Sequence, residues 1–274
     1  MQADDEGLGK VAGVKRKAEA VGGELPHVSG YRLRTVGASD VLDALARACR
    51  HEPALLQRSF ILTGREECED EDIRASFQMR LGAVGVTAAS IDDAYRERAE
   101  HAPPTRRRGR RTLGALVSRA IAEARDVVAE LAAGDGTQPQ VQLVRNAHNE
   151  WEVDGSFVVY EQGGHFAVHN DAAGERKSNR RYTALVTLLP SKAHTGETEF
   201  PTFDHRGPRA FAGSAGSVLA WRNVGAGGFP DARAAHRALP ASAAPSASPL
   251  AFRSAHADGG YVRACKVVVN VWFR

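Results

Sequence analysis

The sequence contains little cysteine. Cys49, Cys68 and Cys265 are the only three among its 274 residues. An odd number of widely spaced cysteines matches neither a disulfide framework nor the spacing of zinc ligands. These features exclude a small disulfide-stapled protein and a zinc-finger module.

Long apolar runs are also lacking. No stretch approaches the ~20 consecutive apolar residues that a membrane-spanning helix requires. The first residues, Met1 to Glu6, are acidic, whereas a secretory signal begins basic and continues apolar. We therefore expect a cytoplasmic protein with no membrane partner.

The charge excess is small. The 36 Lys and Arg residues exceed the 33 Asp and Glu residues by a formal net charge of +3, which does not by itself indicate nucleic-acid binding. Part of the excess lies in the run from Arg106 to Arg111, which has no interleaved aromatic residues for base stacking. A solvated linker is the favoured interpretation of this run, and a nucleic-acid-associated substrate is the alternative.

The composition that remains, 43% apolar and 25% charged residues, is typical of a folded globular chain. Residues 1–29 show no sustained period and are predicted to form a mobile tail. Residues 30–135 are predicted to form a mostly helical support region. It has one helix that opens at Ser39 and Asp40, charged surface helices and a linker between 66 and 111, and a longer helix over 113–131 that ends before Gly134.

From residue 136 the pattern changes to short β-type runs separated by Gly, Pro, Asn and Asp. This pattern is typical of an antiparallel sandwich or barrel, so residues 136–274 are predicted to form a mainly β domain. A low-complexity segment interrupts it, and we interpret residues 241–260 as an inserted loop. The predicted strands cover residues 141–144, 157–160, 182–189, 217–221 and 261–273.

The chemistry is concentrated around His169 and Asp171. On an extended strand, side chains two residues apart project to the same face, so this imidazole and carboxylate would meet at one point. They supply two of the three ligands of a 2-His-1-carboxylate site, the arrangement that leaves positions open on iron(II). An H-x-D triplet also arises by chance in a chain with ten histidines, so its meaning depends on its neighbours.

Those neighbours resemble the prolyl 4-hydroxylase-like branch of the iron(II)- and 2-oxoglutarate-dependent oxygenases. The family pattern runs Y-x-x-G, H-x-D, R-x-x-T, G-x-T-x-F-P, a G-x-x-x-x-F/W strand, a second His, and a Lys six residues before a Trp. The resemblance covers about residues 140–274. The matching residues are Tyr160, Gly163, His169, Asp171, Arg180, Thr183, Gly196 to Pro201, Gly216 to Trp221, Lys266 and Trp272.

The second histidine has two candidates. Seven positions match the family run around the distal ligand and select His236, whereas the usual spacing of ten residues before Lys266 selects His256. We favour His236, because several matched positions arise by accident less readily than one matched spacing. The seven positions are Asn223, Val224, Gly228, Pro230, Asp231, His236 and Pro240.

Lys266 is the candidate for binding the cosubstrate. It is flanked by Val267 to Val269 on a strand that should be buried, where a lysine without an anionic partner is rare, so a bound carboxylate would explain it. The resemblance implies that Tyr160 and Thr198 donate hydrogen bonds to the same carboxylate of 2-oxoglutarate. The alternatives are an outward-facing Lys266 and ordinary sheet composition for the other two residues. Trp272 either lines the pocket or packs within the sandwich.

The resemblance implies a double-stranded β-helix (jelly-roll, cupin-like) core supported by N-terminal helices. It also implies metal ligation and catalysis by His169, Asp171 and His236, with His256 as the alternative distal ligand. The implied cofactors are iron(II), 2-oxoglutarate and O₂, with ascorbate as a further candidate.

The expected reaction is hydroxylation of a C–H bond. Related halogenases replace the carboxylate ligand with a small residue, so Asp171 favours hydroxylation. The expected substrate is a peptidyl proline, or a related amino acid or small metabolite. A non-catalytic β-sandwich module that binds a small acid is the alternative from a different class.

Overall fold

The computed structural model describes residues 28–33, 36–59, 61–63, 66–68, 72–99, 112–136, 138–146, 148–173, 179–204, 207–243 and 250–274. Most of the predicted tail and the run from Arg106 to Arg111 lie outside these residues. No helix within the described ranges is long and apolar enough to cross a membrane.

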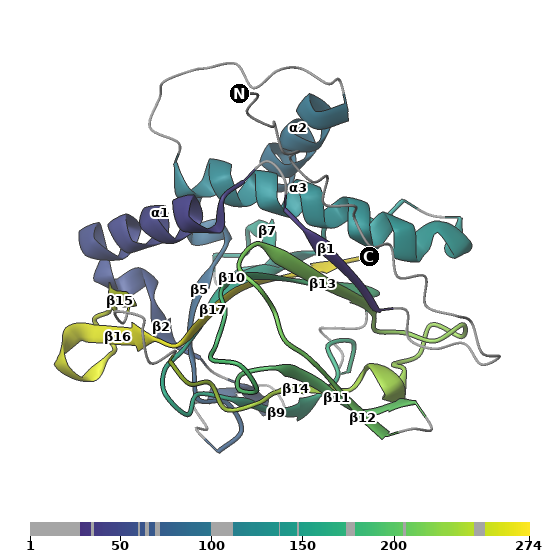
Figure 1. The fold of residues 1–274 in the computed structure, drawn as a ribbon. Coiled ribbons are helices and arrows are strands. Elements are labelled where there is room, and N and C mark those ends of the chain that lie inside the picture. The colour runs from purple at the N-terminus through teal and green to yellow at the C-terminus, as the bar shows by residue number, and fades with distance from the viewer. Residues whose placement is uncertain are drawn as a thin grey trace, which may run out of the picture.

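Two antiparallel sheets form the core of the fold (Figure 1). The seven-stranded main sheet has the order β1-β13-β10-β17-β8-β5-β2 and the four-stranded minor sheet the order β12-β11-β14-β9. The main strands are β1 (Val28–Arg32), β2 (Gln57–Arg58), β5 (Phe77–Arg80), β8 (Gly155–Tyr160), β10 (Tyr182–Leu189), β13 (Ser217–Arg222) and β17 (Lys266–Phe273). The minor strands are β9 (Phe166–His169), β11 (Thr198–Asp204), β12 (Gly207–Phe211) and β14 (His236–Ala238).

The two faces of the main sheet differ in character. Along β17, Val267, Val269 and Val271 belong to the large apolar core, whereas Lys266 and Asn270 point to the opposite face and line a cavity. This follows from the two-residue period of a strand. Helices α1 (Ala38–His51) and α3 (Leu113–Ala132) cover the apolar face, and the minor sheet lies on the other side (Figure 1). The functional side chains are thus confined to the space between the two sheets.

Helix α3 is the main apolar support of the sheet. Apolar residues recur along it at intervals of three and four, and most of them are buried in the core. Its first turn is capped by Thr112, whose side-chain oxygen accepts a hydrogen bond of 3.2 Å from the Ala115 N–H. As predicted, the helix ends before Gly134; a short 3₁₀ segment (Ala133–Asp135) follows it, and Gly136 after that segment adopts a positive φ of 66°.

Helix α1 begins slightly earlier than predicted. Its N-cap is Gly37, not Ser39, and no side chain caps the first turn. The Gly37 carbonyl instead accepts hydrogen bonds from the Asp40 and Val41 N–H groups, at 3.1 and 3.3 Å.

Within the described residues between 66 and 111, the predicted surface helices are found only as α2 (Ala88–Ala99). The segment before it forms β4 (Glu66–Cys68), which pairs with β3 (Ile61–Thr63), and then β5. Phe77 and Met79 alternate with Gln78 and Arg80, and this period of two places β5 beside β8 in the main sheet. The first half of the chain therefore contributes β1, β2 and β5 as well as helices.

Two small hairpins complete the structure. Strand β6 (Leu143–Arg145) pairs with β7 (Trp151–Val153), just before β8. Strand β15 (Leu250–Arg253) pairs with β16 (Tyr261–Ala264), in the segment where we predicted an inserted loop. This second hairpin lies outside both main sheets, beside α1 (Figure 1).

Candidate active site

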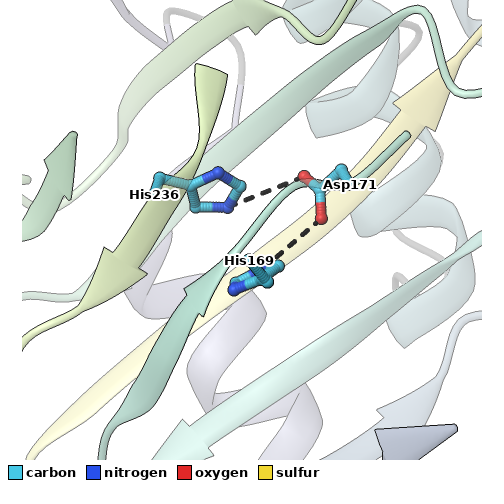
Figure 2. Close-up of side chains that lie close together, drawn as sticks. All are labelled: His169, Asp171 and His236. Atoms are coloured by element: carbon cyan, nitrogen blue, oxygen red, sulfur yellow. Dashed lines mark ion pairs between the residues drawn. The ribbon is translucent and has the colours of Figure 1, made fainter. Parts of the chain in front are cut away.

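His169, Asp171 and His236 come together between the two sheets. The two histidines are directly paired across β9 and β14, and their ring centroids are 4.3 Å apart. The Nε2 atom of His169 lies 3.5 Å from Asp171 Oδ1, and the Nε2 atom of His236 lies 3.7 Å from Asp171 Oδ2 (Figure 2). One potential ligand atom from each residue lies within 4.8 Å of the other two. Among the described residues, His236 and not His256 joins this cluster.

Both imidazoles are oriented by the same local contact. Nδ1 of His169 lies 2.9 Å from the carbonyl oxygen of Ala167, and Nδ1 of His236 lies 2.9 Å from that of Ala234. A carbonyl oxygen can only accept, so each Nδ1 carries the proton and donates. In neutral histidine this leaves the lone pair on Nε2, the atom that faces Asp171. Metal-binding histidines are commonly held in this way.

Aromatic packing fixes the two rings further. The imidazole of His236 is 4.7 Å from the indole of Trp221 and 5.6 Å from the ring of Phe200, measured between centroids. Phe166 stacks on His169 at 3.8 Å. Phe200 and Trp221 are the aromatic residues of the G-x-T-x-F-P and G-x-x-x-x-W elements, so these motifs position the distal histidine.

Asp171 lies in the turn that follows β9 and is only 2% exposed. Thr183 Oγ1 donates a hydrogen bond of 2.7 Å to its Oδ2, and Asn223 Nδ2 donates one of 2.8 Å to Thr183 Oγ1. Burial alone would raise the pKa of Asp171. The imidazoles of His236 and His169 and the Arg180 guanidinium lower it well below its ordinary value. A carboxylate kept ionised in a buried position is suited to a bound cation.

The loop before β14 brings His236 into place. Val224 forms an isolated bridge with Pro230, and Gly228 takes a positive φ of 76° within the turn between them. Asp231 then caps the short 3₁₀ helix Ala232–Ala234 by accepting from the Arg233 N–H at 2.9 Å. The residues that match the family run around His236 therefore build the turn that starts β14.

His256 lies elsewhere in the fold. It is exposed in the connection between β15 and β16, where its backbone N–H donates to Ser254 Oγ at 3.1 Å. The structure therefore does not bring it to the cluster.

The donor set of the cluster fits a divalent transition metal. Two imidazole nitrogens and one carboxylate, with other coordination positions left open, are the ligands that non-heme iron(II) oxygenases use. The protonated Nδ1 atoms and the hydrogen bond from Thr183 orient all three donors before any metal is present.

The cluster opens into a cavity of about 510 Å³ between the sheets. Lys266 and its strand partner Tyr160 lie on the main-sheet wall, and Thr198 lies on the wall formed by β11. The cavity therefore contains all three residues that we predicted for cosubstrate binding, together with the candidate metal ligands.

Lys266 is 6% exposed, and its ammonium donates a hydrogen bond of 2.6 Å to the Gly196 carbonyl oxygen. Gly196 has a φ of 60°, and a Cβ added to it would lie 2.6 Å from the side chain of Ser191, so glycine is required at this turn. Burial lowers the pKa of Lys266 to about 8, and the charge of Glu197 partly opposes this shift. Among the described residues, no carboxylate lies within ion-pair distance of Lys266.

Tyr160 is buried beside Lys266. The lysine ammonium lies 5.4 Å from the centroid of its ring. Burial raises the pKa of the Tyr160 hydroxyl, although the charge of Arg74 opposes this, so the hydroxyl remains protonated and can donate.

Arg180 and Trp272 form the opposite end of the cavity from Lys266 along β17. The Arg180 guanidinium makes two hydrogen bonds to Asp154, at 2.6 and 2.7 Å, and stacks 3.6 Å from the Trp272 ring centroid. Trp272 thus lines the cavity, which settles the alternative left open by the sequence.

Sequence reasoning missed the role of two residues in the site and the presence of a third. Thr183 and Asn223 matched the family pattern, but nothing in the sequence showed that they form a hydrogen-bonded chain to Asp171. Arg74, which also lines the cavity, lies in the segment predicted to form surface helices. The signal that could have found it is the alternation of Phe77 and Met79 just after it.

The fold resembles that of solved prolyl hydroxylases. A prolyl hydroxylase from Trichoplax adhaerens, solved in complex with a hypoxia inducible factor oxygen degradation domain peptide fragment, aligns with a TM-score of 0.51 and 11% identity. This alignment covers 90% of the present chain and 82% of that chain. A prolyl-4-hydroxylase from Pseudomonas putida aligns with a TM-score of 0.46 and 14% identity, over 92% and 93% of the two chains. No family model matches the sequence, and no curated protein matches it either.

The likeness to the Trichoplax enzyme shows the fold. The predicted fold class, a mainly β jelly-roll core with flanking helices, is confirmed. The resemblance to prolyl 4-hydroxylase-like oxygenases, first inferred from motifs, is confirmed at the level of architecture.

Proposed function

We propose that the protein is an iron(II)- and 2-oxoglutarate-dependent dioxygenase that hydroxylates a C–H bond. The observation that carries this proposal is that the cluster of His169, Asp171 and His236 shares one cavity with a buried lysine that has no carboxylate partner among the described residues.

In this proposal the three clustered side chains hold iron(II), which together with 2-oxoglutarate and O₂ supplies the oxidising power. The chain's own residues bind and orient. The hydrogen bond from Thr183 keeps Asp171 in place, and the fixed Nδ1 protons keep both Nε2 atoms turned toward the metal position. Asp171 occupies the ligand position that is a small residue in related halogenases, which favours hydroxylation.

Lys266, Tyr160 and Thr198 form the proposed site for the far carboxylate of 2-oxoglutarate. Burying an unpaired ammonium costs desolvation free energy, and an ion pair with a bound anion offsets that cost. The neighbouring Val158 and Val268 also line this cavity and are buried, so they exclude water from the ion pair.

The proposed substrate is a peptidyl proline, or a related amino acid or small metabolite. The Trichoplax enzyme was solved with a peptide fragment, which supports a peptide as one member of this group. Specificity in such folds is carried by loops, and the fold alone does not select among these substrates.

The test is optical and anaerobic. Wild-type protein given iron(II) and then 2-oxoglutarate should develop the visible charge-transfer absorption of the chelated cosubstrate, and His169→Ala should abolish it. His256→Ala is the matched control and should retain it.

Absence of the band in the wild type, or its persistence in His169→Ala, would contradict the proposal. Binding of 2-oxoglutarate without iron would instead favour the non-catalytic small-acid module. Succinate release in air, screened over proline peptides, free amino acids and small metabolites, then identifies the substrate.

A further inference from the structure

Arg74 is tied to the strand that carries His169. It forms an isolated antiparallel bridge with Phe166, and hydrogen bonds on both sides hold the segment in register. The Ala75 N–H donates to the His165 carbonyl at 3.0 Å, and the Ala167 N–H donates to the Ile73 carbonyl at 2.7 Å. The segment therefore extends the minor sheet beyond β9 and fixes the backbone from which the Arg74 side chain enters the cavity.

The Arg74 guanidinium lies close to the metal cluster. Its Cζ atom is 4.6 Å from the Phe166 ring centroid, and Phe166 in turn stacks on His169 at 3.8 Å with an interplanar angle of 23°. Phe166 thus contacts both the guanidinium and the imidazole of His169. Arg74, His169 and Asp171 line the same cavity.

The guanidinium uses little of its hydrogen-bonding capacity on the protein. Its Nε donates to Ser76 Oγ at 3.2 Å, and no other hydrogen bond links it to a described residue. Four of its five N–H donors thus remain for a ligand, in the planar geometry that matches a carboxylate with two parallel hydrogen bonds.

The charge of Arg74 also lacks compensation. Within the described part of the chain no carboxylate lies within ion-pair distance of it. Burial lowers the pKa of Arg74, and the nearby Tyr160 and Asp171 oppose the shift. Arginine does not lose its proton in proteins, so an anion is the means of balancing its charge.

The other arginines of the cavity differ from Arg74. Arg180 is paired with Asp154, and Arg80 is paired with Glu152 at 2.9 Å. Arg145 is exposed to solvent and stacks on Trp151. Once Lys266 is assigned to 2-oxoglutarate, Arg74 is the partly buried cation of the cavity that still requires an anion.

We propose that Arg74 binds a carboxylate of the substrate to be hydroxylated, so that the substrate is a small acid such as a free amino acid or hydroxy acid; this rests on the proposed function. Two further polar atoms of the cavity fit such a ligand. Asn270 Oδ1 and Trp272 Nε1 are buried without a hydrogen-bond partner in the part of the chain that the structure describes. The amino or hydroxyl group of the substrate can donate to Asn270 Oδ1, and an oxygen of the substrate can accept from Trp272 Nε1.

The experiment measures binding to protein loaded anaerobically with iron(II) and 2-oxoglutarate. The probes are the free proteinogenic amino acids and their 2-hydroxy acids, each paired with its primary amide, and the readouts are calorimetric heat and the change in the visible band. At least one acid should bind about 10- to 100-fold more tightly than its amide. Arg74→Gln should remove this preference, and Arg74→Lys should retain part of it.

Arg145→Gln is the matched control, because it removes an exposed arginine from the same cavity. It should preserve the preference for the acid. The inference is overturned if no acid binds, if acid and amide bind equally, or if Arg74→Gln keeps the preference. A visible band that forms normally in both wild type and Arg74→Gln shows that the proposed function stands even if this inference fails, whereas a band missing from the wild type removes the proposed function itself.

Discussion

The two ends of the cavity are built on different principles. At the metal end, the polar atoms that hold the ligands in place have partners within the protein: each histidine Nδ1 has a carbonyl, and Asp171 has Thr183. At the cation end, Lys266 carries a positive charge without a carboxylate within ion-pair distance among the described residues. The metal end is preorganised, whereas the cation end depends on the anions that the protein binds.

The largest expected effect lies at the metal end. His236→Ala should lower affinity for iron(II) by more than about 100-fold, because loss of a ligand exceeds the 10- to 100-fold typical of losing a residue that only supports one. Competition with a colorimetric chelator measures it. His256→Ala is the matched substitution and should have no effect; the opposite pattern would show that the distal ligand has been assigned to the wrong histidine.

At the cation end, Lys266→Met should weaken 2-oxoglutarate binding by about 10- to 100-fold, since it removes a charge-assisted hydrogen bond. Affinity for iron(II) should be unchanged. Calorimetry with each ligand in turn measures both. If iron affinity falls equally with 2-oxoglutarate affinity, the two ends are not independent.

The same variant should be more stable than the wild type when no ligand is present. The pKa of Lys266 falls from 10.5 to about 8 on folding, and at 1.36 kcal/mol per unit the protonated side chain costs up to about 3 kcal/mol at pH 7. Removing it should therefore raise the free energy of unfolding, as measured by urea denaturation. A lower stability would mean that the hydrogen bond to Gly196 outweighs the cost of burial.

A substitution of Thr183, which supports Asp171 at the metal end, should weaken iron binding, whereas Lys266→Met should leave it unchanged. Thr183→Val removes the hydrogen bond to Asp171 and keeps the side-chain volume nearly constant, so we expect about a tenfold loss of iron affinity. Thr187→Val, on the same strand and also buried, is the control. Equal effects of the two substitutions would show that packing, not the hydrogen bond, is responsible.

The smallest effect is a pH dependence restricted to the cation end. Only protonated Lys266 can pair with a carboxylate, so affinity for 2-oxoglutarate should be constant below pH 8. It should then fall by about tenfold around pH 9, and in total by no more than the loss that Lys266→Met causes. The unfolded chain keeps its proton up to a pKa near 10.5, so the stability of ligand-free protein should rise between pH 8 and 10.5. Lys266→Met should show neither trend.

How much the sequence can predict depends on how local each signal is. His169 and Asp171 are two residues apart, so their shared face on a strand can be predicted from spacing. The burial of Lys266 can be predicted from the valines beside it. The local run of residues around His236 favoured it over His256, but the pairing of β14 with β9 that brings His236 beside His169 joins distant segments and follows from no local pattern. Arg74 reaches the cavity only because its segment joins the minor sheet, and its charged surroundings in sequence resemble a surface helix.

The direct pairing of His236 with His169 has a mechanical consequence. Each residue of a strand faces the opposite side from its neighbour, so a slip of one residue in β14 would turn His236 outward and Arg237 inward. A cation bound by both imidazoles would therefore link the two strands, and its binding would stabilise their register. Amide hydrogens of β9 and β14 should then exchange with solvent more slowly once iron is bound, while those of the β15–β16 hairpin should not change.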